Sequence, residues 1–161
     1  MKAFLASPLA GALKVTSKFG ARELGLRTRP HNGIDLAAPL GTHVLAPGPG
    51  RVVLSDRTEA DEEDAGGIEL VIKLDNGYHV GFAHLLTTTV GVGDRVETGE
   101  IVGGVGNSGL HTTGPHLHLT LRDPSGVRID PEPHLPRSLL LLLVLGGIAG
   151  GAAWWAWRHR R

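Results

Sequence analysis

The sequence predicts a mainly β protein, with one antiparallel β domain followed by a single C-terminal transmembrane helix. Three observations support this. The chain has 161 residues and 24 glycines, which separate short β-branched and aliphatic runs in the manner of an all-β fold with many turns. No amphipathic helix of about 12 residues stands out before residue 138. An uncharged apolar stretch, 138–157, then follows.

Five segments have the apolar pattern of strands, and two of them form a predicted hairpin. The predicted strands are 51–55, 68–74, 78–83, 99–104 and 116–121. Asp75-Asn76-Gly77 lies between the second and third, and Asn-Gly readily adopts the positive φ angles of a tight turn. The acidic run 61–64 is expected in an exposed loop.

The composition changes at Pro136, which sets the expected boundary between a domain at 1–135 and a tail at 136–161. A helix over 138–157 would be about 30 Å long, the thickness of the bilayer core. Three tryptophans gather at its C-terminal end and three arginines follow, as at a membrane interface. The tail therefore predicts a single-pass membrane protein.

The flanks of this stretch bear on topology and assembly. The C-terminal flank has more arginines than the N-terminal flank, which favours a cytoplasmic C-terminus and a domain on the outer side of the membrane. Gly146/Gly150 and Gly147/Gly151 form two Gly-x-x-x-Gly pairs, which would allow a homodimer through the helix. The first eight residues do not resemble a secretory signal.

Charge and cysteine content exclude several classes of function. The formal net charge is zero, so no nucleic-acid partner is expected. Cysteine is absent, which excludes a disulfide framework and a thiolate metal site. Any metal ion must therefore be held by Asp, Glu or some of the nine histidines.

Two short motifs place histidines where they could bind a metal ion. In His31-Asn32-Gly33-Ile34-Asp35, an imidazole and a carboxylate lie four residues apart. In the predicted strand 116–121, His116 and His118 share one face with Thr120, while the intervening leucines face a core. Either motif alone also fits ordinary surface histidines.

Two further segments complete the set. His84 ends the return strand of the predicted hairpin, where a structural role is the plain alternative. The turn-rich segment 106–114, with Gly106-Asn107-Ser108-Gly109, leads into the strand that carries His116.

Taken in order, these motifs resemble the lysostaphin and LytM-type metallopeptidases of family M23. The similarity rests on His-x-Gly-Ile-Asp, Ala-His-Leu and Thr-Gly-Pro-His-Leu-His, and it extends over roughly residues 7–133. The resemblance implies a LytM-type, duplicated-hybrid-motif-like β domain that hydrolyses peptides of peptidoglycan with Zn²⁺. It also implies that His31, Asp35 and His118 bind the zinc and that His84 and His116 are catalytic.

Residue chemistry agrees with this assignment. Two imidazoles and one carboxylate suit zinc and leave a fourth position open for water. Thr120 stands where many members carry an acidic residue, and only 30 residues precede His31, so no inhibitory pro-segment is expected. His111 is close enough to the turn at 112–114 to contact substrate. The remaining histidines are expected at the surface: His43, His79, His134 and His159.

Three alternatives stay open. The chain could be a catalytically inactive LytM-like regulator or binding module, because some relatives have lost their metal residues. It could also be a sugar-phosphotransferase-like domain, although the His-x-Gly-Ile-Asp motif argues against that. If the chain is an enzyme, a short wall peptidase with a membrane anchor and no recognisable signal peptide suggests a phage or virion lytic protein.

Overall fold

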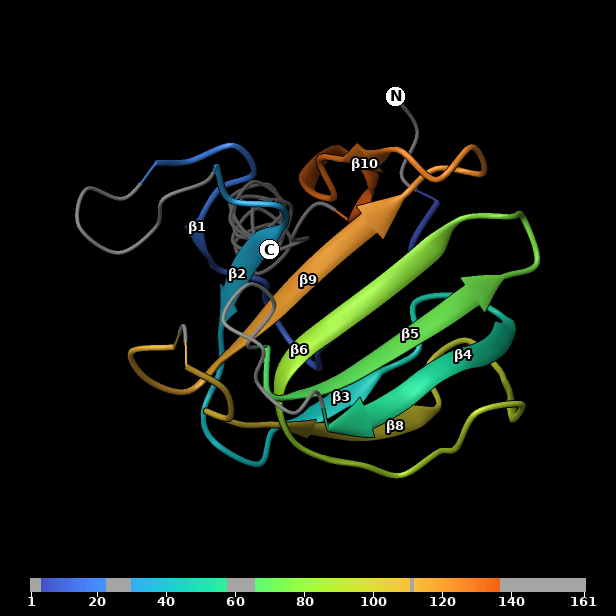
Figure 1. Ribbon diagram of the computed structural model, residues 1–161, viewed down its shortest axis with the longest axis horizontal. Helices are drawn as coiled ribbons and strands as arrows, with labels where there is room; N and C mark the ends of the chain where they lie inside the picture. Colours follow the sequence, from blue (N-terminus) through green and yellow to red (C-terminus); the bar gives the residue numbers. More distant parts are fainter. Residues whose placement is uncertain (1–3, 23–29, 58–65, 111, 137–161) are drawn as a thin grey trace, which may run out of the picture.

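The computed structural model describes residues 4–22, 30–57, 66–110 and 112–136 (Figure 1). These residues form one curled antiparallel sheet with a short 3-10 helix, η1 (Glu132–His134). The strands are β1 (Val15–Ser17), β2 (Ile34–Ala37), β3 (His43–Leu45), β4 (Gly50–Arg57), β5 (Ile68–Leu74), β6 (His79–Thr88), β7 (Arg95–Val96), β8 (Ile101–Val105), β9 (His116–Arg122) and β10 (Arg128–Ile129). The mainly β class predicted from the sequence is therefore confirmed.

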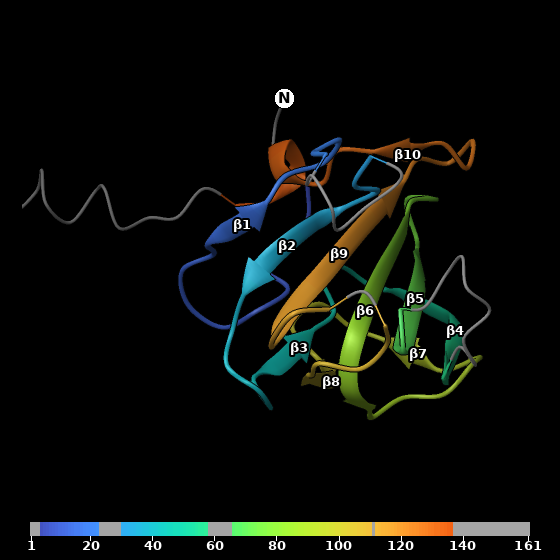
Figure 2. The ribbon, with the colours of Figure 1, turned by 60° about the vertical axis from the view of Figure 1, so that its left-hand side comes forward.

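The main path of the sheet runs β1-β2-β9-β6-β5-β4-β7, with β10 on the outer end of β9. β3 and β8 pair with each other, and β8 also pairs with the last part of β6. They lie behind the main sheet in the view of Figure 1, and Figure 2 shows the same two layers from the side. One face of the main sheet is thus covered by β3 and β8.

All five predicted strands exist, with shifted ends. The segment 68–74 is β5 as predicted, whereas β6 extends to Thr88 instead of ending at residue 83. The strands β1, β2 and β3 were not predicted, because each has only three or four residues and no long alternating pattern.

The prediction that His84 ends its strand is wrong, since it lies within β6 at the point where the strand changes partners. Ala83 pairs with β9, while Leu85 pairs with β8. At this junction His84 has φ 62°, the one positive φ among the non-glycine residues that the structure describes. This left-handed conformation is uncommon outside glycine, although histidine is among the residues that tolerate it.

The β5–β6 turn also differs from the expected geometry. Gly77 has φ 87°, but Asn76 does not adopt a positive φ. Gly77 donates its N–H to Leu74 O, and Leu74 donates to Tyr78 O. The hairpin therefore closes through a three-residue loop with one left-handed glycine, instead of a two-residue turn with two left-handed residues.

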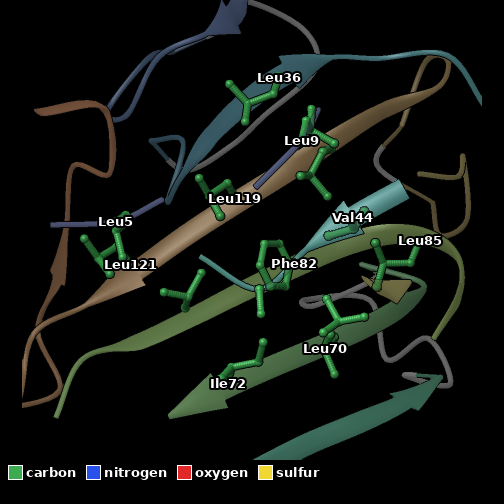
Figure 3. Close-up of a cluster of buried hydrophobic side chains, with 14 of the residues drawn as sticks. Leu5, Leu9, Leu36, Val44, Leu70, Ile72, Phe82, Leu85, Leu119 and Leu121 are labelled. Atoms are coloured by element: carbon green, nitrogen blue, oxygen red, sulfur yellow. The ribbon is translucent and has the colours of Figure 1, made fainter. Parts of the chain in front are cut away.

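The core lies between the main sheet and the β3–β8 layer (Figure 3). Leu117, Leu119 and Leu121 of β9 are fully buried, as their alternation with His116 and His118 predicted. Phe82, Leu70 and Ile72 fill the same space from β6 and β5. Because one face of β9 is packed in this way, its other face presents the histidines.

Two predicted features cannot be compared with the structure. The stretch 138–157 and the acidic run 61–64 lie outside the described residues. Within the described ranges, no helix is long and apolar enough to cross a membrane. The transmembrane helix therefore stays a prediction.

Candidate metal centre

The site begins with a direct cross-strand pair. Asp35 of β2 lies opposite His118 of β9 in the antiparallel register, so both side chains point to the same face of the sheet. Asp35 Oδ1 is 2.8 Å from His118 Nδ1. Both residues are buried, at 6% and 8% exposure. The pairing of two short strands thus fixes the spacing of these two groups.

His31 joins the pair from the segment that leads into β2. Its Nε2 atom is 3.0 Å from His118 Nδ1 and 3.2 Å from Asp35 Oδ1, and the residue is 2% exposed. Gly33 makes this approach possible, because a Cβ atom there would lie 2.3 Å from Leu119 O. Close packing against β9, and not a special φ angle, is therefore the reason for glycine at this position.

The inward-facing atoms of His31, Asp35 and His118 fit a cation. The Nδ1–H of His31 donates to Lys18 O, and the Nε2–H of His118 donates to Asn32 Oδ1. In the neutral rings that these bonds select, the inward nitrogens are acceptors, like the carboxylate. Acceptors this close repel each other unless a metal ion or a proton lies among them. The three ligand atoms lie within 4.8 Å of one another, and their types suit zinc.

The electrostatics of Asp35 are dominated by its two imidazole neighbours. Burial alone would raise the pKa of Asp35. When a proton instead of a metal ion lies among the three groups, hydrogen bonds and charge interactions with His118 and His31 outweigh that effect and hold the pKa well below its ordinary range. Asp35 is therefore a carboxylate at neutral pH and available as a metal ligand.

His84 lies beside this cluster with a defined tautomer. Its ring centroid is 5.8 Å from that of His118 and 4.9 Å from that of His116. Its Nδ1–H donates to Ser108 O at 2.9 Å, so the neutral ring has its lone pair on Nε2. Burial lowers the pKa of His84 to about 4, against the opposing bond to Ser108. His84 is thus a neutral base at physiological pH.

His116 is held in a similar way and is the second histidine next to the cluster. Its Nδ1–H donates to Gly114 O at 2.8 Å. Its Nε2 is buried, has no hydrogen-bond partner within the described part of the chain, and lies 3.7 Å from Asp35 Oδ1. A buried nitrogen without a partner is costly in a folded protein and often marks a functional group.

The structure thus brings the five predicted site residues together at one place: His31, Asp35, His84, His116 and His118. Their division into metal ligands and catalytic residues stays a prediction. His111 and His159 lie outside the described residues. Of the expected surface histidines, His43 is exposed and His79 is half-buried, but His134 is buried, because it packs against Phe4.

Sequence reasoning missed the partners that orient the histidines. Asn32 lies inside the first motif, and a polar residue beside two ligands was a usable signal. Ser108 belongs to the turn-rich segment whose function was not recognised. Ser17, whose hydroxyl is 3.0 Å from His31 Nδ1, lies 14 residues away in sequence, and nothing in its local pattern indicates that contact.

Comparisons with known proteins agree with this geometry. The model of the family described as Peptidase family M23 matches residues 29–131. The peptidoglycan DD-endopeptidase ShyA of Vibrio cholerae is 36% identical over 123 residues, which is 74% of this chain and 27% of that protein. The chain spans about a quarter of the length of the curated relatives it matches.

Two solved structures share the fold. A zinc-containing peptidase from Vibrio cholerae has a TM-score of 0.67 and 30% identity, covering 79% of this chain and 38% of that one. The catalytic domain of lysostaphin from Staphylococcus simulans has a TM-score of 0.65 and 29% identity, covering 75% and 90%. These likenesses confirm the predicted M23 resemblance and the lysostaphin-type fold. The prediction of zinc as the cofactor is confirmed at the level of the family.

Proposed function

The chain belongs to peptidase family M23, and from this premise we propose that it is a zinc-dependent endopeptidase that hydrolyses peptide bonds in peptidoglycan. The observation that carries the proposal is the cluster of His31, Asp35 and His118, with two further histidines beside it. The name of its relative from Vibrio cholerae supports peptidoglycan as the substrate.

The residues divide the chemistry between them. His31, Asp35 and His118 would hold the zinc ion. The bound ion would act as a Lewis acid and make water a stronger nucleophile. His84 is neutral at physiological pH, because burial lowers its pKa to about 4, and it can accept a proton on Nε2. His116 can stabilise negative charge on the substrate or pass a proton to the leaving amine, once its own Nε2 is protonated.

Digestion of defined peptidoglycan fragments, with product masses as the readout, tests the activity and identifies the bond. Metal content of the purified chain should be measured on the same sample. An inactive regulator would release no peptide from any fragment, with or without added zinc. A peptidase should release peptides, stop when a chelator removes the metal, and recover when zinc is restored.

We also propose that residues 138–157 anchor the chain in a lipid bilayer, with the catalytic domain facing the wall. The uncharged 20-residue length and the flanking tryptophans and arginines support this. Protease treatment of intact spheroplasts that express the full chain tests the topology. If the domain is digested only after the membrane is broken, the wall-facing arrangement is refuted in that host. Delivery of the domain to the wall by lysis or by a virion would then be favoured.

The two Gly-x-x-x-Gly pairs support a homodimer through the same segment. Crosslinking in detergent should then give a dimer that Gly146→Ile and Gly150→Ile abolish. A monomer that these substitutions leave unchanged would contradict the dimer but not the anchor.

A further inference from the structure

One row of residues across the sheet is basic at every position from β10 to β7. The pairs that define it are Arg128–Arg122, Arg122–His79, His79–Lys73, Lys73–Arg51 and Arg51–Arg95. We call these six residues the basic row. His79 is half-buried and the others are exposed. Neighbouring strands are about 4.8 Å apart, so the row is about 24 Å long.

The basic row is on the same face of the sheet as the metal centre. Arg122 and His118 lie four residues apart on β9, so their side chains share a face, while Leu119 and Leu121 point into the core. At about 3.3 Å per residue, the row lies about 13 Å from His118. It is at the arrowhead end of β9 in Figure 1.

The row of residues between the two sites carries no charge. It consists of Thr120, Gly81 and Val71, which pair across β9, β6 and β5. Gly81 has no side chain, and a Cβ atom there would lie 2.5 Å from Thr120 Oγ1 and 3.7 Å from Val71 Cγ2. Gly81 is buried beneath these two neighbours, so no charged side chain separates the metal centre from the basic row on these strands.

The charges of the basic row are only partly offset. At the β7 end of the row, Arg95 forms ion pairs with Asp75 and Glu97. Arg128, at the β10 end, also has an interaction partner. Arg95, with a smaller contribution from Arg51, holds the pKa of Asp75 below its ordinary value. In the part of the chain that the structure describes, no carboxylate lies within ion-pair distance of Arg51, Lys73 or Arg122.

Fold stability does not account for this arrangement. Like charges directly opposite each other on neighbouring strands destabilise a sheet. The row holds three such pairs: Arg128–Arg122, Lys73–Arg51 and Arg51–Arg95. The central members of the row lie on β9, β6 and β5, which are interior strands, so protection of a sheet edge does not account for them either. An anionic ligand on this face would turn the repulsion into binding energy.

We propose that the basic row is a subsite for carboxylates of the peptide substrate, so that the chain prefers wall peptides with free carboxylates to those in which they are amidated. This inference rests on the proposed function. The distance of about 13 Å corresponds to about four residues of extended peptide. A carboxylate that far from the bond at the metal centre reaches the row, where guanidinium groups form strong charge-assisted bonds with it.

Sedimentation with purified peptidoglycan sacculi at 4 °C, using the full metal-loaded chain in a non-ionic detergent, tests the subsite. Three wall preparations are compared: untreated, chemically amidated at the carboxylates, and treated with hydrofluoric acid to remove phosphate polymers. The variants are Lys73→Gln and the double substitution Lys73→Gln/Arg122→Gln. Lys14→Gln is the matched control, because Lys14 is exposed and precedes β1 at the far edge of the sheet.

Amidation should weaken wild-type binding by about three- to tenfold, as expected for the loss of two exposed ion pairs. The double variant should bind untreated walls as weakly as the wild type binds amidated ones, and added salt should reduce this difference. Lys14→Gln should bind like the wild type. The amidation comparison uses the wild-type chain alone, so it stands even if a variant fails to fold.

Two results would overturn the subsite. One is equal binding of amidated and untreated walls by the wild type. The other is a loss of binding after hydrofluoric acid treatment but not after amidation, which would identify a phosphate polymer as the ligand. Release of peptides from untreated walls is measured separately. A chain that binds free carboxylates selectively but releases no peptide would keep the subsite and refute the peptidase.

Discussion

His84 Nδ1 lies 2.9 Å from the carbonyl oxygen of Ser108, and this bond joins the strained junction of β6 to the turn-rich segment before β9. Ser108 is itself held in place, since its hydroxyl donates to Leu85 O and accepts from the N–H of Ile68. The two contacts keep the carbonyl of Ser108 aimed at the imidazole. His84 is therefore fixed in one tautomer by a residue that also bonds to β5 and β6 at this junction.

Acid should destabilise the chain through His84. Burial lowers the pKa of His84 from 6.5 to about 4 in the folded state, so between these values the unfolded chain binds a proton that the folded chain does not. His84 does not change the free energy of unfolding above about pH 6.5, and it lowers that free energy as the pH drops toward 4. At pH 5 the loss should be about 2 kcal/mol. Urea unfolding at pH 7.5 and pH 5, with a chelator present to remove metal, measures it.

His84→Asn provides the control, because asparagine does not titrate and tolerates a left-handed backbone. Between pH 7.5 and pH 5, the free energy of unfolding of this variant should fall by about 2 kcal/mol less than that of the wild type. The lowered pKa of Asp35 acts only below its ordinary value of 3.8, outside this window. Equal losses in the two proteins would show that His84 is not the titrating group.

Asn32 should tune the affinity for metal. Its Oδ1 accepts the Nε2–H of His118 at 3.0 Å, which leaves the lone pair of Nδ1 facing the cluster. Asn32→Ala removes this acceptor, and loss of such a partner typically weakens metal binding by about 10- to 100-fold. Competition with a chromophoric chelator measures the zinc affinity. Asn76→Ala, in the β5–β6 turn at the other end of the sheet, should leave it unchanged, and an equal effect of both substitutions would contradict this role.

Gly33→Ala should damage both the fold and the site. The added Cβ atom would lie 2.3 Å from Leu119 O and 3.0 Å from His118 Cε1, so β9 or the His31 segment must move. We expect a loss of about 1–3 kcal/mol in stability, together with weaker zinc binding. Thermal unfolding and metal content measure the two effects. Gly91→Ala is the matched control, since the Cβ atom added there would lie at an ordinary 3.7 Å from Asp94 Oδ2. A Gly33→Ala protein with wild-type stability would show that the His31 segment adapts freely.

Much of the site could be predicted because its signals are local. His116, His118 and Thr120 alternate with leucines over one strand, and His31 and Asp35 are four residues apart. The long strand β5 was predicted for the same reason, since its burial pattern repeats every two residues. A family resemblance carried by three ordered motifs then assigned the roles, which spacing alone left open.

The features that were missed depend on contacts between distant parts of the chain. β2 has only four residues, and it is a strand because it pairs with β9 and β1. His84 has a left-handed backbone because β6 passes from one set of neighbours to another there. The basic row exists only in the register of six strands, so its members are scattered from Arg51 to Arg128 in the sequence.

Replacing the two histidines of β9 should separate metal binding from turnover. His118→Ala removes a ligand atom from the cluster, so zinc and activity should be lost together. His116→Ala leaves the three proposed ligands in place, because His116 Nε2 is 3.7 Å from Asp35 Oδ1 and its Nδ1 is bound to Gly114 O. It should keep most of the zinc but lose about 100-fold or more in kcat, the usual contribution of a proton-transferring residue. Metal analysis and turnover on the same peptidoglycan fragment measure both quantities. If His116→Ala released zinc as completely as His118→Ala, His116 would belong to the metal-binding set. The division of roles between the two residues would then have to be withdrawn.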